Sequence, residues 1–466
     1  MERWMSILSP SAYVVVNSLL SDIVLGVTPA QVILLADRRA NYEKVRERLS
    51  SLVRLWTGIS PQVDVYVCNI LSTNDVKRIS KLVDENTIIN LTAGRKIQAM
   101  ILHALAMSKG AKARYVLIVD ERRYGYKPFG VAPFPAIKPL ELEDTSWRTL
   151  SWRYPTIRPY GEDVELDEEE LKAFMNFMSL KHEHFKIFMK YHGIVEELLD
   201  IQVKGLEAKI HIATEDKQLM EHILYSLEAS GILSPANMHQ VLVEVRDLLK
   251  QGYSIFPDTN VFIMRRISWL EETLGHEVLD HILLPRVVYN ELFRLSELKG
   301  RHTPEKGRLM IGFHEYTKLM MKTEKEPPRD EKFANARGDR YLIDEIRART
   351  SPALRPFLLT EDRALSTMAK RMGIKTVLIE PPTLPGEAVE CNVDKIPVLM
   401  WLLASVLGSI HLKVGLHDII LKTAWPRSIK VVMTGDDAAK GLARLVRKTI
   451  EMEKELQEEL DLIMRS

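Results

Sequence analysis

Two stretches of this chain alternate short apolar runs with amphipathic segments, and this alternation constrains the fold more than any other feature. Between residues 12 and 120, five runs (AYVVVNSL, VILLAD, VDVYVCNI, TIINLT and RYVLIVD) alternate with segments of helical spacing such as NYEKVRERLSSLVRLW. The pattern returns between residues 254 and 381. Strict alternation is typical of a parallel sheet covered by helices, whose buried strands are apolar on both faces. The sequence therefore predicts an α/β fold with two such regions.

The segments outside these two regions have a different composition. Residues 124–164 are crowded with proline and then with acidic residues, which indicates a long linker. Residues 165–250 carry mostly helical spacing, with one strand candidate in VKGLEAKIHIAT, so we expect a mainly helical connector compatible with a winged-helix-like module. The C-terminal segment predicts a helix, two strands and a long charged helix. The expected domains are 1–150, 151–252, 253–383 and an α+β extension over 384–466.

Composition limits the classes of function. The 466 residues are 46% hydrophobic and 27% charged, as in a globular protein of several domains. A net charge of +1 gives no bulk attraction for nucleic acid, so such a partner would need a local groove. Cys68 and Cys391 form neither a disulfide framework nor a cysteine zinc site, which fits a reducing cytoplasm. The apolar run 396–410 is shorter than the roughly 20 residues of a spanning helix, so we expect a buried helix and no membrane role.

Acidic residues recur in the second alternating region where predicted strands pass into helices. Asp258 follows the run SIFP, and Asp362 closely follows the run FLL. Asp339 opens the helix DRYLIDEIRA, and Glu291 lies in the helix of LLPRVVYNEL. Because the carboxyl ends of parallel strands meet at one edge of a sheet, three of these acids are expected there, with Glu291 leaning in from its helix.

Each of these acids alone also fits an ordinary helix N-cap. Four of them at comparable strand ends favour a shared site, because clustered carboxylates repel one another unless a cation lies between them. Oxygen ligands suit Mg²⁺ or Mn²⁺, and such ions activate water and neutralise a phosphodiester during its cleavage. The pattern therefore favours a nuclease.

The segments DTNVF, LLPRVVYNEL, RGDRYLIDE and LLTEDRAL resemble, in order and spacing, the four signature segments of PIN-domain ribonucleases. The resemblance covers about 130 residues. It implies cleavage of single-stranded RNA with Mg²⁺ or Mn²⁺, and a metal site made of Asp258, Glu291, Asp339 and Asp362.

Further residues take roles from the same resemblance. Thr259, Asn260 and Thr360 would orient the ligands or a water molecule. Asp344 and Glu345 are candidate accessories, but their helical position favours side chains that face solvent. The implied products carry 5′-phosphate ends.

The first alternating region contains a candidate phosphate loop. The segment TIINLTAGRKIQAM places small residues and Lys96 between a strand and a helix, where the backbone and the helix N-terminus can approach a phosphate. An ordinary tight turn is the alternative. The segment lacks GxGxxG, which disfavours a nicotinamide dinucleotide.

The N-terminal layout resembles the CARF domain, the CRISPR-associated Rossmann-like sensor of cyclic oligoadenylates, over roughly residues 1–150. NSLLSD matches the first ligand loop of that family in position, and NLTAGRK resembles the second. Ala93 stands where glycine is usual and Arg95 where threonine is usual, so neither the ring size nor cleavage of the ligand follows from the sequence. The implied ligand contacts are Asn17, Ser18, Asn90, Thr92, Gly94, Arg95 and Lys96.

The same family pairs two domains about a twofold axis, which matches a rotationally symmetric ring of phosphates. The resemblance thus implies a homodimer. The dibasic pairs Arg38–Arg39 and Arg122–Arg123 also follow strands, but such pairs are usually solvated, so the expected ligand site does not include them.

The combined hypothesis is a cytoplasmic, metal-dependent ribonuclease of type III CRISPR defence that a cyclic oligoadenylate activates. Two alternatives remain open at this point. One is a transcription regulator that binds DNA through a winged-helix-like middle segment. The other is a toxin-like ribonuclease whose N-terminal domain only dimerises it.

Overall fold

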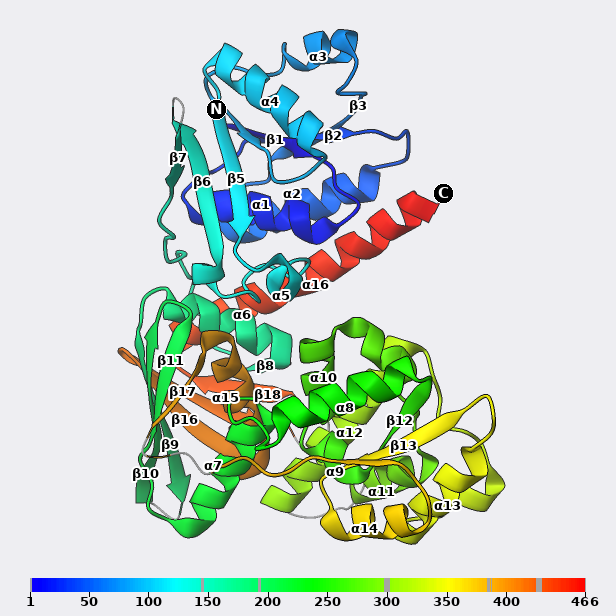
Figure 1. Cartoon of the computed structure of the whole chain (residues 1–466). Coiled ribbons are helices and arrows are strands. Elements are labelled where there is room, and N and C mark those ends of the chain that lie inside the picture. Colours follow the sequence, from blue (N-terminus) through cyan, green and yellow to red (C-terminus); the bar gives the residue numbers. More distant parts are fainter. Residues whose placement is uncertain are drawn as a thin grey trace. The chain divides into compact units, whose positions relative to one another are not determined.

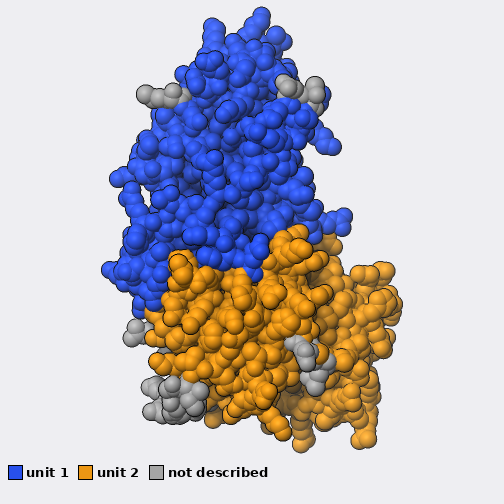
Figure 2. Space-filling model, turned by 90° about the vertical axis from the view of Figure 1, so that its left-hand side faces the viewer, with its two compact units in different colours: residues 1–183, 435–466 blue, residues 184–434 orange. Residues whose placement is uncertain are grey.

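The computed structural model describes residues 2–143, 146–191, 194–296, 302–383, 386, 388–424 and 430–465. The chain divides into two compact units (Figure 2). Unit 1 contains residues 1–183 and 435–466, and unit 2 contains residues 184–434. Both units combine strands with helices, so the expected α/β class is confirmed. The expected C-terminal extension is divided between the two units.

Unit 1 is built on a seven-stranded sheet of order β3-β2-β1-β4-β5-β6-β7 (Figure 1). The strands from β3 to β5 in this order run parallel, whereas β6 and β7 are antiparallel to their neighbours. The strands of this unit are β1 (Arg3–Ile7), β2 (Gln31–Ala36), β3 (Gln62–Val67), β4 (Thr87–Asn90), β5 (Lys112–Ile118), β6 (Ile137–Glu143), β7 (Ser146–Thr149) and β8 (Val164–Leu166).

Helices cover both faces of this sheet. On one face, Met5, Ile7 and Ile89 of the strands pack with Leu102 and Leu105 of α4. Helices α1, α2 and the C-terminal α16 lie on the other face (Figure 1). The helices of unit 1 are α1 (Ala12–Val24), α2 (Glu43–Thr57), α3 (Thr73–Ile79), α4 (Lys96–Lys109), α5 (Glu121–Tyr124), the 3₁₀ turn η1 (Phe134–Ala136), α6 (Glu168–Ser179) and α16 (Asp437–Arg465).

One predicted strand of this region is wrong. AYVVVNSL forms the first turns of α1, and the first strand is the RWMSI segment of β1. Most residues of α1 are buried, because the helix is covered on several sides. A helix that is apolar nearly all round has no amphipathic period, and its β-branched run therefore looks like a strand.

Unit 2 contains a second sheet, in which the strands follow the order β15-β11-β10-β9-β16-β17-β18. Helix α15 packs on β16 and β17 and also contacts α7. As expected, α15 is a buried helix. The strands and helices of this part are β9 (His184–Tyr191), β10 (Ile194–Lys204), β11 (Glu207–Ile212), α7 (Lys217–Ala229), β15 (Ala388–Asn392), η4 (Val393–Lys395), α15 (Ile396–Leu407), β16 (Ser409–Val414), β17 (His417–Thr423) and β18 (Val431–Gly435).

The expectation of a mainly helical, winged-helix-like connector is wrong for residues 184–191 and 194–202, whereas the strand expected in VKGLEAKIHIAT is confirmed as β11. The segments HFKIFMKY (184–191) and IVEELLDIQVK (194–204) form the antiparallel pair β9 and β10. Phe185 and Ile187 are buried while Lys186 between them is partly exposed, which is the period of two of a half-covered strand. Because this apolar segment also fits helical spacing, periodicity alone did not separate the two states.

The remainder of unit 2 surrounds a parallel sheet of order β12-β13-β14. A parallel bridge between Ile255 and Ile282 adds one more chain segment beside β12. Phe256, Phe357 and Leu358 of the strands belong to a core shared with the surrounding helices. The elements are α8 (Met238–Lys250), β12 (Tyr253–Pro257), α9 (Thr259–Ile263), α10 (Arg266–Leu274), η2 (His276–His281), α11 (Arg286–Ser296), α12 (Pro304–Thr323), η3 (Glu331–Phe333), α13 (Asp339–Arg349), β13 (Arg355–Thr360), α14 (Arg363–Arg371) and β14 (Thr376–Leu378).

Within the ranges that the structure describes, no helix combines the length and the apolar character that a membrane crossing requires.

Helix α16 packs closely against the linker of unit 1, and Gly441 makes this approach possible. A Cβ at Gly441 would lie 2.1 Å from the backbone oxygen of Arg158. Alanine normally stabilises a helix by about 1 kcal/mol relative to glycine. We expect the opposite sign here: Gly441→Ala should lower the melting temperature, because the backbone of Arg158 has to move.

The matched control is Gly161→Ala, since no atom lies within 4 Å of a Cβ built at Gly161. This variant should keep the melting temperature of the wild type. A Gly441→Ala protein as stable as the wild type would contradict the close packing of α16.

Candidate active site

Two neighbouring parallel strands deliver polar side chains to one edge of the sheet in unit 2. Strand β12 ends at Pro257, directly before Asp258, and β13 ends at Thr360, two residues before Asp362. The backbone N–H of Asp258 donates to the carbonyl of Leu359 at 3.1 Å, so the parallel pairing continues to this point. The two strand ends therefore lie side by side at the carboxyl edge.

Asp258 is the most deeply buried of the four predicted acids, with 4% of its surface exposed. Its Oδ1 accepts a 2.9 Å hydrogen bond from the backbone N–H of Val261 and caps α9, and its Oδ2 accepts a hydrogen bond from the hydroxyl of Thr360. Burial raises the pKa of Asp258 to about 7, and the charges of Glu361 and Asp362 act in the same direction. The site thus holds a carboxyl group that is costly to ionise without a cation.

Asp362 caps α14 with a single oxygen. Its Oδ1 accepts hydrogen bonds from the backbone N–H groups of Ala364 at 2.6 Å and Leu365 at 2.9 Å. The backbone N–H of Asp362 donates to the hydroxyl of Thr360 at 2.9 Å. Thr360 therefore binds both neighbouring acids and sets their relative positions.

Asp339 is the first residue of α13 and follows Gly338, which has a φ of +82°. Partial burial raises the pKa of Asp339, and the negative charge of Asp362 raises it further. Two carboxylates that disfavour each other's ionisation lie near each other. This arrangement resembles a cation site in its electrostatics.

Glu291 reaches the same region from α11. Its Oε2 accepts a 2.8 Å hydrogen bond from the hydroxyl of Thr259. Asn260, the next residue of α9, is exposed. Thr259 thus contacts Glu291, and Asn260 lies at the exposed side of the site.

All four predicted acids line one cavity of about 130 Å³. Thr259 and Asn260 line it as well, together with apolar side chains from α9, α11, α12, α13 and α14. Thr360 does not line the cavity, but its hydroxyl donates a hydrogen bond to Asp258, which does. The structure therefore brings together the residues that the sequence singled out, although their roles remain a prediction.

The carboxylates fit a divalent cation in number and in chemistry, because hard oxygen donors are what Mg²⁺ and Mn²⁺ prefer. Among the described residues, no three His, Cys, Asp or Glu side chains stand close enough together to hold an ion in this arrangement. Asp258 and Glu291 are engaged by the hydroxyls of Thr360 and Thr259. Coordination of a cation therefore requires these two carboxylates to reorient within the cavity that they line.

The helix caps, which the sequence offered as the alternative to a shared metal site, are present, and the same acids also line one cavity. Asp258 and Asp362 each cap a helix with Oδ1, which fixes the carboxylate at the strand end. A cap therefore does not argue against a ligand role, since it positions the side chain for one.

The expectation that Glu345 faces solvent is wrong. Glu345 is 1% exposed and accepts hydrogen bonds from the backbone N–H groups of Arg286 at 2.8 Å and Val287 at 3.0 Å. It also pairs with Arg349. Glu345 therefore caps the first turn of α11, the helix that carries Glu291. The sequence could not reveal this contact because the two segments are 59 residues apart.

Two residues beside the site were missed. Glu361, between Thr360 and Asp362, forms an ion pair with Arg266, and Arg266 also pairs with Glu228 of α7. Burial raises the pKa of both glutamates, against the opposing charge of Arg266. Only Glu361 could have been singled out from the sequence, because it is an acidic residue next to the predicted ligand Asp362.

The candidate phosphate loop of unit 1 lies between β4 and α4. Gly94 has a φ of +98°, and a Cβ on it would lie 2.3 Å from Cδ1 of Ile7, so a side chain is excluded there. Gly94, Arg95 and Lys96 are exposed, and the backbone N–H of Arg95 donates to Oε1 of Gln98 at 2.8 Å. This part of the prediction lies where a ligand can reach it.

Asn90 and Thr92 are internal to the loop. Asn90 is fully buried and its Nδ2 donates to Oδ2 of Asp22 at 3.1 Å, while its Oδ1 accepts from the backbone N–H of Thr92 at 3.0 Å. The hydroxyl of Thr92 accepts from the backbone N–H of Val116 at 2.8 Å. Both side chains therefore hold the loop on the sheet.

The expected contacts Asn17 and Ser18 are wrong as loop residues, because both lie inside α1. Ser18 is fully buried and donates to the carbonyl of Val14 at 2.7 Å. Nδ2 of Asn17 donates to the carbonyl of Lys127 at 2.9 Å. The misassigned strand caused this error, since the segment that follows the true first strand is LSPS, residues 8–11.

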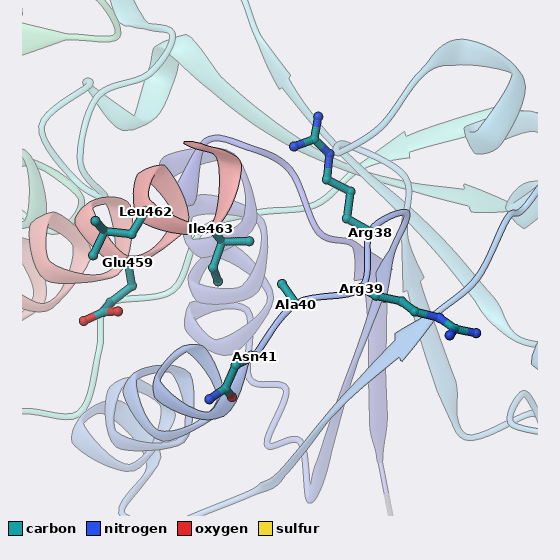
Figure 3. A pocket seen from close by; sticks show the side chains of 7 residues that line it. All are labelled: Arg38, Arg39, Ala40, Asn41, Glu459, Leu462 and Ile463. Carbon is teal, nitrogen blue, oxygen red and sulfur yellow. The ribbon is translucent and has the colours of Figure 1, made fainter. Parts of the chain in front are cut away.

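The reversal of strand order in unit 1 lies between β1 and β4, and ligands of open α/β sheets bind outside the carboxyl ends of strands at such a point. Residues 8–11 and 91–95 follow these two strands. One strand further, Arg38 and Arg39 line an open pocket of about 510 Å³ with Leu462 and Ile463 of α16 (Figure 3). The sequence analysis predicted that this arginine pair is solvated. In the structure the C-terminal helix α16 lies beside the pair.

No known protein-family model matches this sequence, and no curated protein matches it. Several solved structures resemble this chain weakly, and three of them are the following. Can2 from Sulfobacillus thermosulfidooxidans, in complex with cyclic tetra-adenylate, is 15% identical with a TM-score of 0.23, and the match covers 54% of this chain and 52% of that one. A type III CRISPR defence DNA nuclease activated by cyclic oligoadenylate is 10% identical with a TM-score of 0.24, covering 82% and 56%.

Protein VC1899 from Vibrio cholerae is 9% identical with a TM-score of 0.27, covering 94% of this chain and 78% of that one. The aligned part thus spans about half the length of the first two proteins. Similarity at these scores does not indicate a function for this chain. A function is inferred from the residues of its sites.

The raised pKa of Asp258 predicts how the free energy of unfolding changes with pH. The folded protein binds this proton more tightly than the unfolded chain, so the group's contribution to stability is lost as the pH rises from about 3.8 to about 7. We expect Asp258→Asn, without metal, to gain stability relative to the wild type between pH 5 and pH 8, by up to about 4 kcal/mol.

Chemical denaturation in the presence of a chelator measures this difference. Asp344→Asn, which alters a less buried acid on α13, is the control and should show no such trend. A difference between Asp258→Asn and wild type that stays constant with pH would contradict the buried, ionisable carboxyl.

Proposed function

We propose that the protein is a metal-dependent endonuclease of single-stranded RNA that a cyclic oligoadenylate, bound by unit 1, activates in type III CRISPR defence. One observation carries the nuclease: Asp258, Glu291, Asp339 and Asp362 line one cavity at the carboxyl edge of a parallel sheet. The order and spacing of the PIN-like segments support the same function.

A bound Mg²⁺ or Mn²⁺ supplies an activated water and neutralises charge on the scissile phosphate. The four carboxylates would hold such an ion from three helix starts and one helix interior. Thr360 fixes the distance between Asp258 and Asp362, because its hydroxyl bonds to both residues. Thr259 orients Glu291, and the apolar side chains around the cavity limit access of bulk water.

The dimensions of the cavity support a single strand as substrate. Its volume of about 130 Å³ suits one phosphate group with its cation, and Asp258 is recessed from the surface. A flexible single strand can bend a phosphodiester into such a recess more easily than a duplex. The expected products carry 5′-phosphate ends.

The exposed part of the loop after β4 supports the ligand proposal. Gly94 brings the backbone close to a ligand, and the N-terminus of the 14-residue α4 with Arg95 and Lys96 favours a phosphate. Asn90 and Thr92 hold this loop from the inside. The segment 8–11 after β1 replaces Asn17 and Ser18 as the second candidate ligand loop.

An exposed apolar stripe on α4 supports a homodimer through unit 1. Ile97, Met100 and Met107 are 55%, 69% and 49% exposed and lie on one face of the helix by their spacing. A second copy that covers this stripe brings two ligand loops together, which suits a ring with rotational symmetry.

The alternative of a regulator that binds DNA through a winged helix loses its support, since residues 184–191, 194–204 and 207–212 form strands of an antiparallel sheet. An ungated ribonuclease is separated from the proposal by experiment.

The direct test incubates the purified chain with single-stranded RNA and Mn²⁺, with and without cyclic tetra- or hexa-adenylate. We expect cleavage that rises with one of the rings. Asp362→Asn should lower the rate at least about hundredfold, as expected when several kcal/mol of charge stabilisation is lost. Glu326→Gln, at an exposed acid, is the control.

Lys96→Glu should abolish the response to the ring and leave the ligand-free cleavage unchanged, whereas Lys109→Glu at the other end of α4 should leave both unchanged. Cleavage that ignores the ring would contradict the gating. Cleavage of single-stranded DNA alone would overturn the RNA specificity, and no cleavage under any condition would overturn the nuclease.

The dimer has its own test. Met100→Lys places a charge in the apolar stripe, so we expect the mass measured by light scattering to fall from that of a dimer to that of a monomer. Met321→Lys, at a 72% exposed methionine of α12, should leave the mass unchanged. A wild-type protein that is monomeric with and without the ring would contradict this proposal.

A further inference from the structure

Arg266 is the only arginine among the largest fully buried side chains of the described residues, with 1% of its surface exposed. Its Nε donates to Oε1 of Glu361 and its Nη2 donates to Oε1 of Glu228. A buried guanidinium is costly unless it is paired with opposite charge, and here two carboxylates from two different segments accept hydrogen bonds from it.

Glu361 is the middle residue of the segment that carries the site. Thr360 before it bonds to Asp258, and Asp362 after it lines the cavity. The segment 360–362 is therefore held at three points: by Asp258 on one side, by the N-cap of α14 at its end, and by Arg266 through Glu361.

The second arm of Arg266 joins this segment to another layer of unit 2. Glu228 lies in the last turn of α7, and α7 contacts α15, the helix that packs on β16 and β17. Arg266 itself begins α10. A single side chain thus links α7, α10 and the end of β13.

We propose that Arg266 is a positioning residue of the cleavage site, which holds the 360–362 segment so that Asp258 and Asp362 stay beside the same cavity, where they can reorient onto a divalent cation. This inference rests on the proposed function of the same cavity. The geometry requires the guanidinium, because a planar fork donates to two carboxylates in fixed directions and a lysine ammonium does not reproduce it.

The chain offers a matched control in the adjacent residue. Arg265 is also buried, at 5% exposed, and its Nε donates to Oε1 of Glu315 of α12 at 3.0 Å. Arg265→Lys therefore disturbs a comparable buried ion pair without removing the contact to Glu361. The comparison separates a loss of stability from a loss of position.

The experiment titrates Mn²⁺ into the full-length wild type, Arg266→Lys and Arg265→Lys by calorimetry, and measures melting temperature and the Mn²⁺ dependence of RNA cleavage on the same samples. We expect Arg266→Lys to bind Mn²⁺ about tenfold more weakly, as when a residue that supports metal ligands is changed. Saturating Mn²⁺ should restore most of the cleavage rate. Arg265→Lys should lose stability without a change in Mn²⁺ affinity.

Glu361→Gln keeps the size of the contact, so it serves if Arg266→Lys does not fold, and it should weaken Mn²⁺ binding in the same direction. Equal Mn²⁺ affinity in wild type and Arg266→Lys, or an equal loss in Arg265→Lys, overturns the positioning role. A wild type that binds Mn²⁺ but does not cut RNA overturns the proposed function. The Mn²⁺ affinities of wild type, Arg266→Lys and Arg265→Lys then still decide whether Arg266 positions the site. A wild type that binds no Mn²⁺ overturns both.

Discussion

The hydrogen bond from Thr360 to Asp258 joins the ends of two adjacent parallel strands, and the candidate active site depends on this connection. The pairing of β12 with β13 determines that the two residues meet. The same hydroxyl accepts from the backbone of Asp362, so one threonine sets the positions of two acids. Asp339 and Glu291 then approach from helices α13 and α11, which pack against the same core. A small cavity with four carboxylates follows from this arrangement.

The connection has an electrostatic consequence. Burial raises the pKa of Asp258 to about 7, and the pKa of Asp339 is also raised. A fold that only needed caps could use serine or asparagine at these positions without that cost. The acids therefore reduce stability in the absence of a cation, which is common where function rather than stability determines a residue. Arg266 offsets part of the local negative charge through its ion pair with Glu361, the residue between Thr360 and Asp362.

The sequence predicted the elements of the parallel regions well, because strands and helices there have distinct periods and the acids follow the strands directly. It failed where burial removed the period: α1 is covered on several sides, so AYVVVNSL was read as a strand, and Asn17 and Ser18 were assigned to a loop. It also failed for β9 and β10, because the apolar residues of this segment fit both the helical and the strand period. Glu345 and Arg266 could not be assigned roles, since their contacts join segments far apart in the chain.

The central claim is that the cavity between Asp258, Glu291, Asp339 and Asp362 binds a divalent cation, and anomalous X-ray scattering tests it most directly. Crystals of the protein soaked in Mn²⁺ should give an anomalous peak inside this cavity, with oxygens of at least two of the four carboxylates within coordination distance. The peak should disappear in crystals of Asp258→Asn grown under the same conditions. Crystals with ordered Mn²⁺ only elsewhere on the protein, or with an empty cavity at saturating Mn²⁺, would contradict the account.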